Sequence, residues 1–194
     1  MIVDGNTLIF DTDAFDGSDT ESSRITIGDD RLFGELIMTH PNISTIVLVG
    51  GGGNSLAAEG IARKIMEFDL DTVARNRCAS SCATIFLAGR HRQLEKGGWL
   101  CFHRASTTAA DFRGFFQTGK DSGLWQDEFD FASEVFDNGQ ISTRDYIAFL
   151  LSRGVSIEFA LKTLAYSAND AWCPTREELE RHGVLHGDHL PLKP

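Results

Sequence analysis

A regular pattern of apolar and polar segments begins near residue 44. Residues 45–49 (Thr-Ile-Val-Leu-Val) form a continuous apolar, β-branched run that is typical of a buried strand. Four glycines follow at 50–53, and then Asn54 and Ser55, either of which could cap a helix. Apolar side chains then recur at helical spacing, which predicts an amphipathic helix that packs on a sheet: Ala58, Ile61, Ala62, Ile65 and Met66.

The same kind of pattern continues up to residue 103. Residues 72–75 are predicted to form the next strand, and residues 80–88 a buried helix that ends at Gly89. Residues 99–102 predict a further strand, with His103 at its end. The order of strand, glycine turn, helix, strand, helix and strand predicts an α/β layered fold.

Residues 105–150 differ in character, because aromatic side chains are spread without one clean period among polar residues and glycines. We expect this segment to be mostly helical. Two interpretations stay open: an excursion that packs on the body, or a surface for substrate or for a second subunit, where aromatic residues are enriched. Residues 174–184 predict a short helix that Thr175 caps, that Glu178 supports through a capping box and that Gly183 ends.

The composition narrows the classes of partner. A chain of 194 residues can bury a core, and we expect one domain over residues 1–194, with an acidic segment at 1–30 and the excursion at 105–150. Its formal net charge of −10 makes nucleic acid and anionic lipid poor partners. No apolar run approaches the ~20 residues of a membrane span. No secretory leader pattern opens the sequence, which favours a cytoplasmic protein, or a periplasmic one if a leader was removed.

Neither the cysteines nor the acidic residues predict a metal or another cofactor. The four cysteines are too few for a disulfide scaffold and are badly spaced for zinc, so we expect small buried hydrophobes. A redox-sensitive Cys78–Cys82 pair is the alternative. Residues 11–21 resemble a calcium loop, but Phe15 stands at the third ligand position and Asp16 where the turn glycine belongs. A solvated acidic loop is therefore the better interpretation.

Ser80 is the first candidate for chemistry. It follows a predicted strand and precedes a predicted helix, near the positive end of the helix dipole and beside free backbone N–H groups. That position suits a nucleophile for acyl transfer, although Ser80 and Ser81 could simply cap the helix. The glycines at 50–53 could bring an amide close to an oxyanion, and their spacing fits neither phosphate-binding motif. His103 lies one helix and one strand further on, so it could fold back and accept the serine proton.

The order of these motifs resembles the Clp-type serine peptidases, within the wider ClpP/crotonase fold. The likeness rests on the apolar strand with its Gly-Gly turn, on Cys78-Ala-Ser-Ser-Cys-Ala83, on the apolar helix up to Ala-Gly and on the strand that ends in Phe-His. It covers residues 44–104 and is nearest to small Clp-like proteins that carry Cys-Ala-Ser-x-Cys-Ala. The fold that it implies is an α/β, ClpP/crotonase-like spiral of repeated strand-strand-helix units, to which the aromatic-rich helical excursion is added.

The resemblance also implies roles for individual residues. Ser80 would be the nucleophile and His103 the general base. Backbone amides would form the oxyanion hole, those of Gly52 or Gly53 and of Ser81. A third triad member would come late in the chain, where Asp170 lies at about the position of the family's acid, and Asn169 could orient the imidazole instead.

The sequence differs from the Clp peptidases in three respects. Cys82 stands where the Clp peptidases usually have a small residue, residues 1–30 do not look like their axial loops, and residues 105–150 do not look like any part of them. A partnership with an ATP-dependent unfoldase is therefore not implied. Proteins of this fold commonly form rings or stacked trimers, so we expect a homo-oligomer.

The expected function is that of a serine hydrolase, a peptidase that cleaves peptides or unfolded protein through an acyl-enzyme. One alternative keeps the fold and changes the chemistry: a crotonase-like acyl-CoA enzyme, which would need a carboxylate base and basic residues for the CoA phosphates. Another is a non-catalytic Clp-like scaffold. A serine–lysine dyad, as in signal peptide peptidase A, would use Lys64 or Lys96. A cysteine nucleophile would use Cys101, which shares a strand face with His103.

Overall fold

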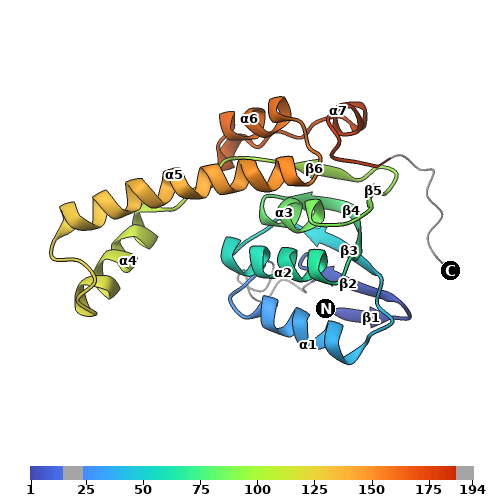
Figure 1. Ribbon diagram of the computed structural model, residues 1–194, viewed down its shortest axis with the longest axis horizontal. Helices are drawn as coiled ribbons and strands as arrows, with labels where there is room; N and C mark the ends of the chain where they lie inside the picture. Colours follow the sequence, from blue (N-terminus) through green and yellow to red (C-terminus); the bar gives the residue numbers. More distant parts are fainter. Residues whose placement is uncertain (15–23, 187–194) are drawn as a thin grey trace.

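The computed structural model describes residues 1–14 and 24–186 as a mixed α/β structure around one sheet (Figure 1). The strands are β1 (Ile2–Asp4), β2 (Thr7–Asp11), β3 (Thr45–Gly50), β4 (Asp71–Ala79), β5 (Arg92–Leu94) and β6 (Trp99–Cys101). The strand order is β1-β2-β3-β4-β5, and β6 also pairs with β4. β1 runs antiparallel to β2, whereas the other pairs are parallel, so β2, β3, β4 and β6 end at the same edge of the sheet.

The helices in the described residues alternate with the strands up to α3, and from residue 109 to residue 181 only helices follow. They are α1 (Asp29–Thr39), α2 (Ser55–Glu67), α3 (Ser81–Leu87), α4 (Ala109–Asp121), α5 (Glu128–Ser152), α6 (Ile157–Ala165) and α7 (Arg176–Arg181), with a short 3-10 helix η1 (Ala168–Asp170). None of them is both long and apolar enough to cross a lipid bilayer.

Strand β4 is longer than the predicted segment 72–75 and changes partner along its length. Its first half pairs with β5 and its last three residues pair with β6. Against β3, Leu48 lies opposite Ala74 but Gly50 lies opposite Cys78, so two extra residues are accommodated on β4. Asn76 takes a left-handed conformation there, with φ 53°. This β-bulge changes the direction of the end of the strand, which leads directly into Ser80.

Helices α1, α2 and α3 lie side by side against the sheet (Figure 1). Asn54 caps α2 by accepting a hydrogen bond from the N–H of Ala57, as one of the two predicted caps. Of the predicted apolar face, Ala58, Ile61, Ala62 and Ile65 are buried, but Met66 is 36% exposed. The face is therefore narrower than predicted, because Met66 lies in the last turn of the helix.

Helices α4 and α5 project from the body as an antiparallel pair (Figure 1). We call residues 109–140 the arm; it lies within the segment that was predicted to be mostly helical. The two helices touch through a cluster of aromatic rings with centroids 4.7–6.2 Å apart, namely Phe112, Phe116, Trp125 and Phe131. Gly119 is required at this contact, because a Cβ there would overlap the Trp125 ring. Other apolar side chains of the arm are exposed, including Phe115, Leu124, Phe129 and Phe136.

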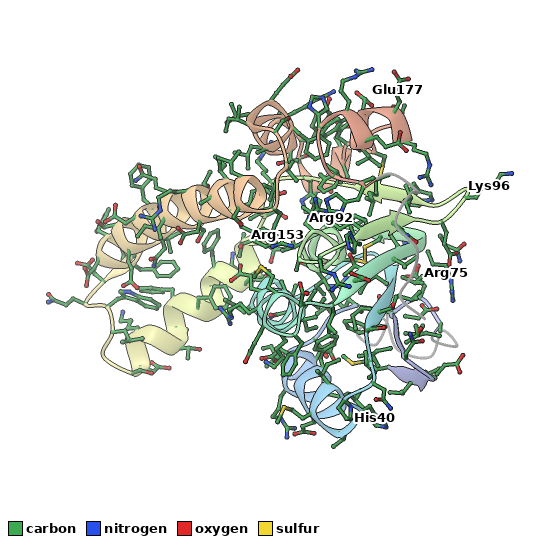
Figure 2. The ribbon with its side chains drawn as sticks, turned by 45° about the vertical axis from the view of Figure 1, so that its right-hand side comes forward. His40, Arg75, Arg92, Lys96, Arg153 and Glu177 are labelled. Carbon is green, nitrogen blue, oxygen red and sulfur yellow. A yellow bond between two sulfur atoms is a disulfide. The ribbon has the colours of Figure 1, made fainter. Side chains whose placement is uncertain are left out.

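The C-terminal residues dock on the body through a buried arginine. Arg92, on β5, is 1% exposed and donates to the carbonyls of Val184, Gly183 and Arg153 at 2.8–2.9 Å (Figure 2). Burial lowers the pKa of its guanidinium to about 10. The acceptors are backbone carbonyl groups and not carboxylates. Through these hydrogen bonds Arg92 holds the chain after α7 against the body.

Candidate active site

The C-terminal ends of strands β4 and β6 lie side by side at the edge of the sheet where the parallel strands stop. In the pairing of β4 with β6, Ala79 lies opposite Cys101, and the N–H of Ser80 donates to the Cys101 carbonyl at 3.0 Å. Ser80 therefore leaves β4 directly beside the residues that lead from β6 into His103. The two residues singled out from the sequence are brought to one edge by strand pairing alone.

Ser80 has an unusual backbone conformation, with φ 56° and ψ −126°. A side chain is strained in this region, at a cost of roughly 1–3 kcal/mol. The turn is a sharp transition from strand to helix, because the N–H groups of Ala83 and Thr84 already donate to the Ser80 carbonyl. Ser80 occupies the N-cap position of α3, as the alternative interpretation had it, but its side chain makes no capping hydrogen bond. Strained residues of this kind concentrate at sites where geometry is functionally constrained.

Ser81 has a different task. Its side chain is 8% exposed, and its hydroxyl donates to the carbonyl of Gly53 at 2.9 Å. The first residue of α3 is thereby tied to the glycine turn after β3. The motif Ala-Ser-Ser thus contains one serine that holds the turn and one whose hydroxyl makes no hydrogen bond to the described residues.

The glycine turn lies against Ser80. A Cβ on Gly52 would come within 2.8 Å of Ser80 Cβ and of the Ser81 nitrogen, so only glycine allows this approach. Ile25 pairs with the outer side of the turn, where its N–H donates to the Gly52 carbonyl and its carbonyl accepts from Asn54. Among the described residues, no hydrogen bond uses the N–H of Gly52, Gly53 or Ser81 as donor. These are the three amides that the resemblance assigns to an oxyanion hole, and none of them donates to another group of the described residues.

His103 is held by its neighbours on both sides. Phe102 exchanges two backbone hydrogen bonds with Trp172, at 2.8 and 2.9 Å, and the N–H of Arg104 donates to the Tyr166 carbonyl at 3.0 Å. The imidazole Nδ1 lies 2.7 Å from the carbonyl of Arg104. Because a carbonyl can only accept, Nδ1 carries the proton, and Nε2 is the basic nitrogen.

The loop between these two anchors contains Asn169 and Asp170. It begins after Tyr166, which is bonded to Arg104, and ends before Trp172, which is bonded to Phe102. The two ends of the loop are therefore held by the residues on either side of His103. Asp170 is exposed and closes the 3-10 helix η1, where its N–H donates to the Ser167 carbonyl. Within the described part of the chain, no hydrogen bond joins His103 to Asp170 or Asn169, or joins Ser80 Oγ to His103. The three segments are neighbours, but their side chains are not engaged as a hydrogen-bonded triad.

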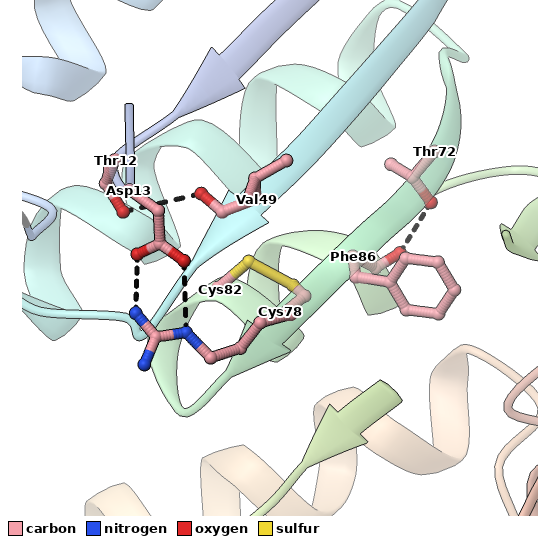
Figure 3. Close-up of a disulfide and its surroundings, with 8 residues drawn as sticks. Thr12, Asp13, Val49, Thr72, Cys78, Cys82 and Phe86 are labelled. Atoms are coloured by element: carbon pink, nitrogen blue, oxygen red, sulfur yellow. Dashed lines mark hydrogen bonds and ion pairs between the residues drawn. A yellow bond between two sulfur atoms is a disulfide. The ribbon is translucent and has the colours of Figure 1, made fainter. Parts of the chain in front are cut away.

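All four cysteines are paired in disulfides, which corrects the expectation of small buried hydrophobes. Cys78 at the end of β4 is bonded to Cys82 in α3, so this disulfide brackets Ser80 (Figure 3). Cys101 at the end of β6 is bonded to Cys173. The sequence could not pair Cys101 with Cys173, because 72 residues separate them and the chain returns only after the whole arm. A cysteine nucleophile at Cys101 is excluded in this disulfide-bonded state.

An ion pair that the sequence did not indicate borders the glycine turn. Arg77 forms a bidentate pair with Asp13, with Nε–Oδ2 and Nη2–Oδ1 distances of 3.1 and 2.5 Å (Figure 3). The carboxylate raises the pKa of the Arg77 guanidinium. A Cβ on Gly51 would meet the same guanidinium at 3.5 Å, so the pair joins the chain after β2 to the turn. The sequence does not single out Arg77, because β4 also contains Arg75, which pairs with Glu95 instead.

The other candidate features lie apart from these residues. Residues 15–23 of the supposed calcium loop lie outside the described residues; within those described, no cluster of three or more potential metal ligands occurs. Asp11, before them, accepts from the N–H groups of Asp13 and Ala14 as a tight turn. An open groove of about 630 Å³ lies between α1 and α2, and its lining, which includes Met38, Lys64 and Phe68, contains none of the predicted site residues.

Comparison with known proteins gives a fold and no sequence family. No family model matches the chain, and no curated protein matches it significantly. Among solved structures, it is similar to a variant of ClpP1 from Listeria monocytogenes, with a TM-score of 0.61 and 16% sequence identity, over 93% of this chain and 89% of that one. The α/β sheet and its covering helices therefore have a ClpP-like fold, as the resemblance implied.

Proposed function

We propose that the protein is a serine hydrolase, most simply a peptidase that acts on peptides or unfolded protein. The observation that carries the proposal is Ser80 itself. It is a strained residue packed against a glycine turn, and neither its hydroxyl nor the turn's Gly52 and Gly53 amides donate to any other group of the described residues. The ClpP-like fold supports the peptide class of substrate. A helix cap or a packing serine would need neither the strain nor the unused donors.

The reaction would follow an acyl-enzyme route. Ser80 Oγ attacks the scissile carbonyl carbon while its proton passes to Nε2 of His103. The oxyanion would form against the amides of Gly52 or Gly53 and of Ser81, which donate to no other group of the described residues. The imidazolium then gives its proton to the leaving amine as the C–N bond breaks. Water, deprotonated by the same imidazole, attacks the ester and releases the acid and Ser80.

The Nδ1 proton of His103 is held by the Arg104 carbonyl in the ligand-free protein. We assign Asp170 as the third member of the triad, since its loop is fastened on both sides of His103, and Asn169 is the second choice in the same loop. In either case the side chain would replace or supplement the carbonyl once substrate binds. Hydrogen bonds of catalytic groups commonly tighten only in the complex.

Two further features bear on the oligomeric state and on the cellular compartment. The exposed Phe115, Phe129 and Phe136 of the arm support self-association, because large apolar side chains on a projecting helix pair gain by being covered. The two disulfides support an oxidising compartment rather than the cytoplasm that the opening residues suggested.

Incubation with unfolded protein tests the proposal, followed by mass spectrometry of newly formed termini. Wild-type protein is expected to generate them and Ser80→Ala is not. Calorimetry with an acyl-CoA separates the alternative chemistry. Micromolar binding of acyl-CoA without cleavage would overturn the peptidase in favour of a crotonase-like enzyme, and neither cleavage nor binding would leave a Clp-like scaffold.

A further inference from the structure

The disulfide Cys101–Cys173 stands at a particular place in the molecule. Cys101 is two residues before His103, and Cys173 is three residues after Asp170. The bond lies next to the paired residues Phe102 and Trp172, on the strand that carries the proposed base. It therefore fastens the His103 segment to the Asp170 loop by a covalent link beside a single pair of backbone hydrogen bonds.

The chain between the two cysteines contains the whole arm. It leaves the sheet after Phe102, runs through α4 and α5, and returns through α6 to Trp172 (Figure 1). The arm is largely exposed, and the described part of it has no disulfide of its own. Without a link at its base, any displacement of the arm would be transmitted to both ends of this excursion, where His103 and Asp170 lie.

Aromatic packing also joins the segments at the base of the arm, so we expect them to stay together without the disulfide. Trp172 stacks on Tyr166, lies 4.8 Å from Phe159 between ring centroids, and receives the Lys162 ammonium over its face at 4.1 Å. Phe102 and Phe159 make an edge-to-face contact at 5.1 Å. Removal of the disulfide should thus loosen the register between the two segments without unfolding the body.

We propose that Cys101–Cys173 is a positioning disulfide, which holds His103 in register with the Asp170 loop independently of the arm. It rests on the proposed function, because it assigns the device that keeps the base of that site in place. Cys173 is exposed, whereas Cys78 and Cys82 are 0% and 3% exposed. Gentle reductant therefore reaches Cys101–Cys173 first and leaves the disulfide around Ser80 intact.

The test compares wild-type protein with the double variant Cys101→Ser/Cys173→Ser in the rate at which a fluorophosphonate modifies Ser80. We expect the variant to be modified ~10- to 100-fold more slowly, as for a displaced catalytic group. Its rate should also lose the dependence on pH that imidazole catalysis gives to the wild type. Ile37→Ala, which opens the core between α1 and the sheet, is the matched control: it lowers stability but keeps the rate and the pH profile.

A second readout keeps the proposal separate from the proposed function. The amide protons of Phe102 and Trp172, which bond to each other's carbonyls, should exchange with solvent faster in the double variant, while those of β3 stay protected. If wild-type protein is not modified at Ser80, the proposed function fails. The exchange rates of these two amides then test by themselves whether the disulfide holds the two segments in register. Unchanged exchange, or a modification rate and pH profile equal to wild type, would overturn the proposal.

Discussion

The arm and the strand edge around Ser80 are built on opposite principles. The arm has two exposed helices joined by an aromatic cluster, with a single glycine admitting the Trp125 ring. The strand edge has parallel strands, a glycine turn closed by backbone hydrogen bonds, a bidentate ion pair and two disulfides. One region projects with exposed apolar side chains, whereas the other is cross-linked close to Ser80 and His103.

This difference explains how a projecting arm and a precise site can share one chain. Catalytic groups must be held to within about 0.5 Å by the surrounding structure. A long excursion inserted between His103 and Asp170 would work against that requirement. The structure meets it by closing the base of the excursion with Cys101–Cys173 and by bracketing Ser80 with Cys78–Cys82.

The largest effect is expected at Ser80. Ser80→Ala should lower peptide hydrolysis at least ~10³-fold, because it removes the nucleophile and leaves the turn in place. Steady-state cleavage and the melting temperature are the measurements. Ser81→Ala is the matched control: it removes the neighbouring hydroxyl and its bond to Gly53, and should keep most of the turnover. Equal losses in the two variants would count against Ser80 as nucleophile.

The two disulfides should differ in what they contribute to stability. In the loop-entropy model, the 72-residue separation of Cys101–Cys173 corresponds to about 4 kcal/mol and the four-residue separation of Cys78–Cys82 to about 2 kcal/mol. Chemical denaturation of the two double serine variants measures both. The variant at Cys101 and Cys173 should have the lower midpoint, and the reverse order would show that the arm already orders the unfolded chain.

Gly119→Val should disrupt the arm while sparing the strand edge. The new side chain overlaps Trp125 and forces α4 away from α5. Limited proteolysis should then cut within residues 109–140, whereas hydrolysis of a short peptide should stay within about twofold of wild type, the scatter of a substitution remote from the site. Gly114→Val, at a glycine with open space around it, is the control. A large loss of hydrolysis in Gly119→Val would contradict the independence of the two regions.

The smallest effect is a dependence of stability on pH near the C-terminal docking. Burial, then the nearby Arg92 charge, lowers the pKa of His186 from its ordinary value near 6.5 to about 4. The unfolded chain binds this proton more readily, so stability should fall as the pH drops through the window from 6.5 to 4. His186→Asn should flatten this part of the curve, and His40→Asn, an exposed histidine, should not. An unchanged slope in His186→Asn would assign the dependence to other groups.

Much of the central fold follows from the sequence because its elements carry clear local patterns: a continuous apolar run, a helical apolar face or a capping residue. The apolar run of β3, the capped amphipathic α2 and the buried α3 are predicted at nearly their observed bounds. Strands β1, β2 and β5 are not predicted, since they have five residues or fewer and gain their order from pairing with neighbouring strands. Helix α1 is missed, although Phe33, Leu36 and Ile37 lie at helical spacing and pack into the core.

The site was predictable only as far as local motifs reach. The positions of Ser80 and His103 at ends of neighbouring strands agree with the sequence pattern. Their link to the Asp170 loop depends on a bridge and a disulfide that connect residues 70 or more apart, which no periodicity encodes. The same holds for the Arg77–Asp13 pair, which joins β4 to the chain after β2.

The central claim is that the structure activates Ser80. Intact-mass analysis of the disulfide-bonded protein after treatment with a fluorophosphonate, followed by peptide mapping, tests it most directly. The account predicts one adduct per chain, on Ser80, and none on Ser80→Ala. A folded protein that carries both disulfides and forms no adduct, or forms it at another residue, would contradict the claim.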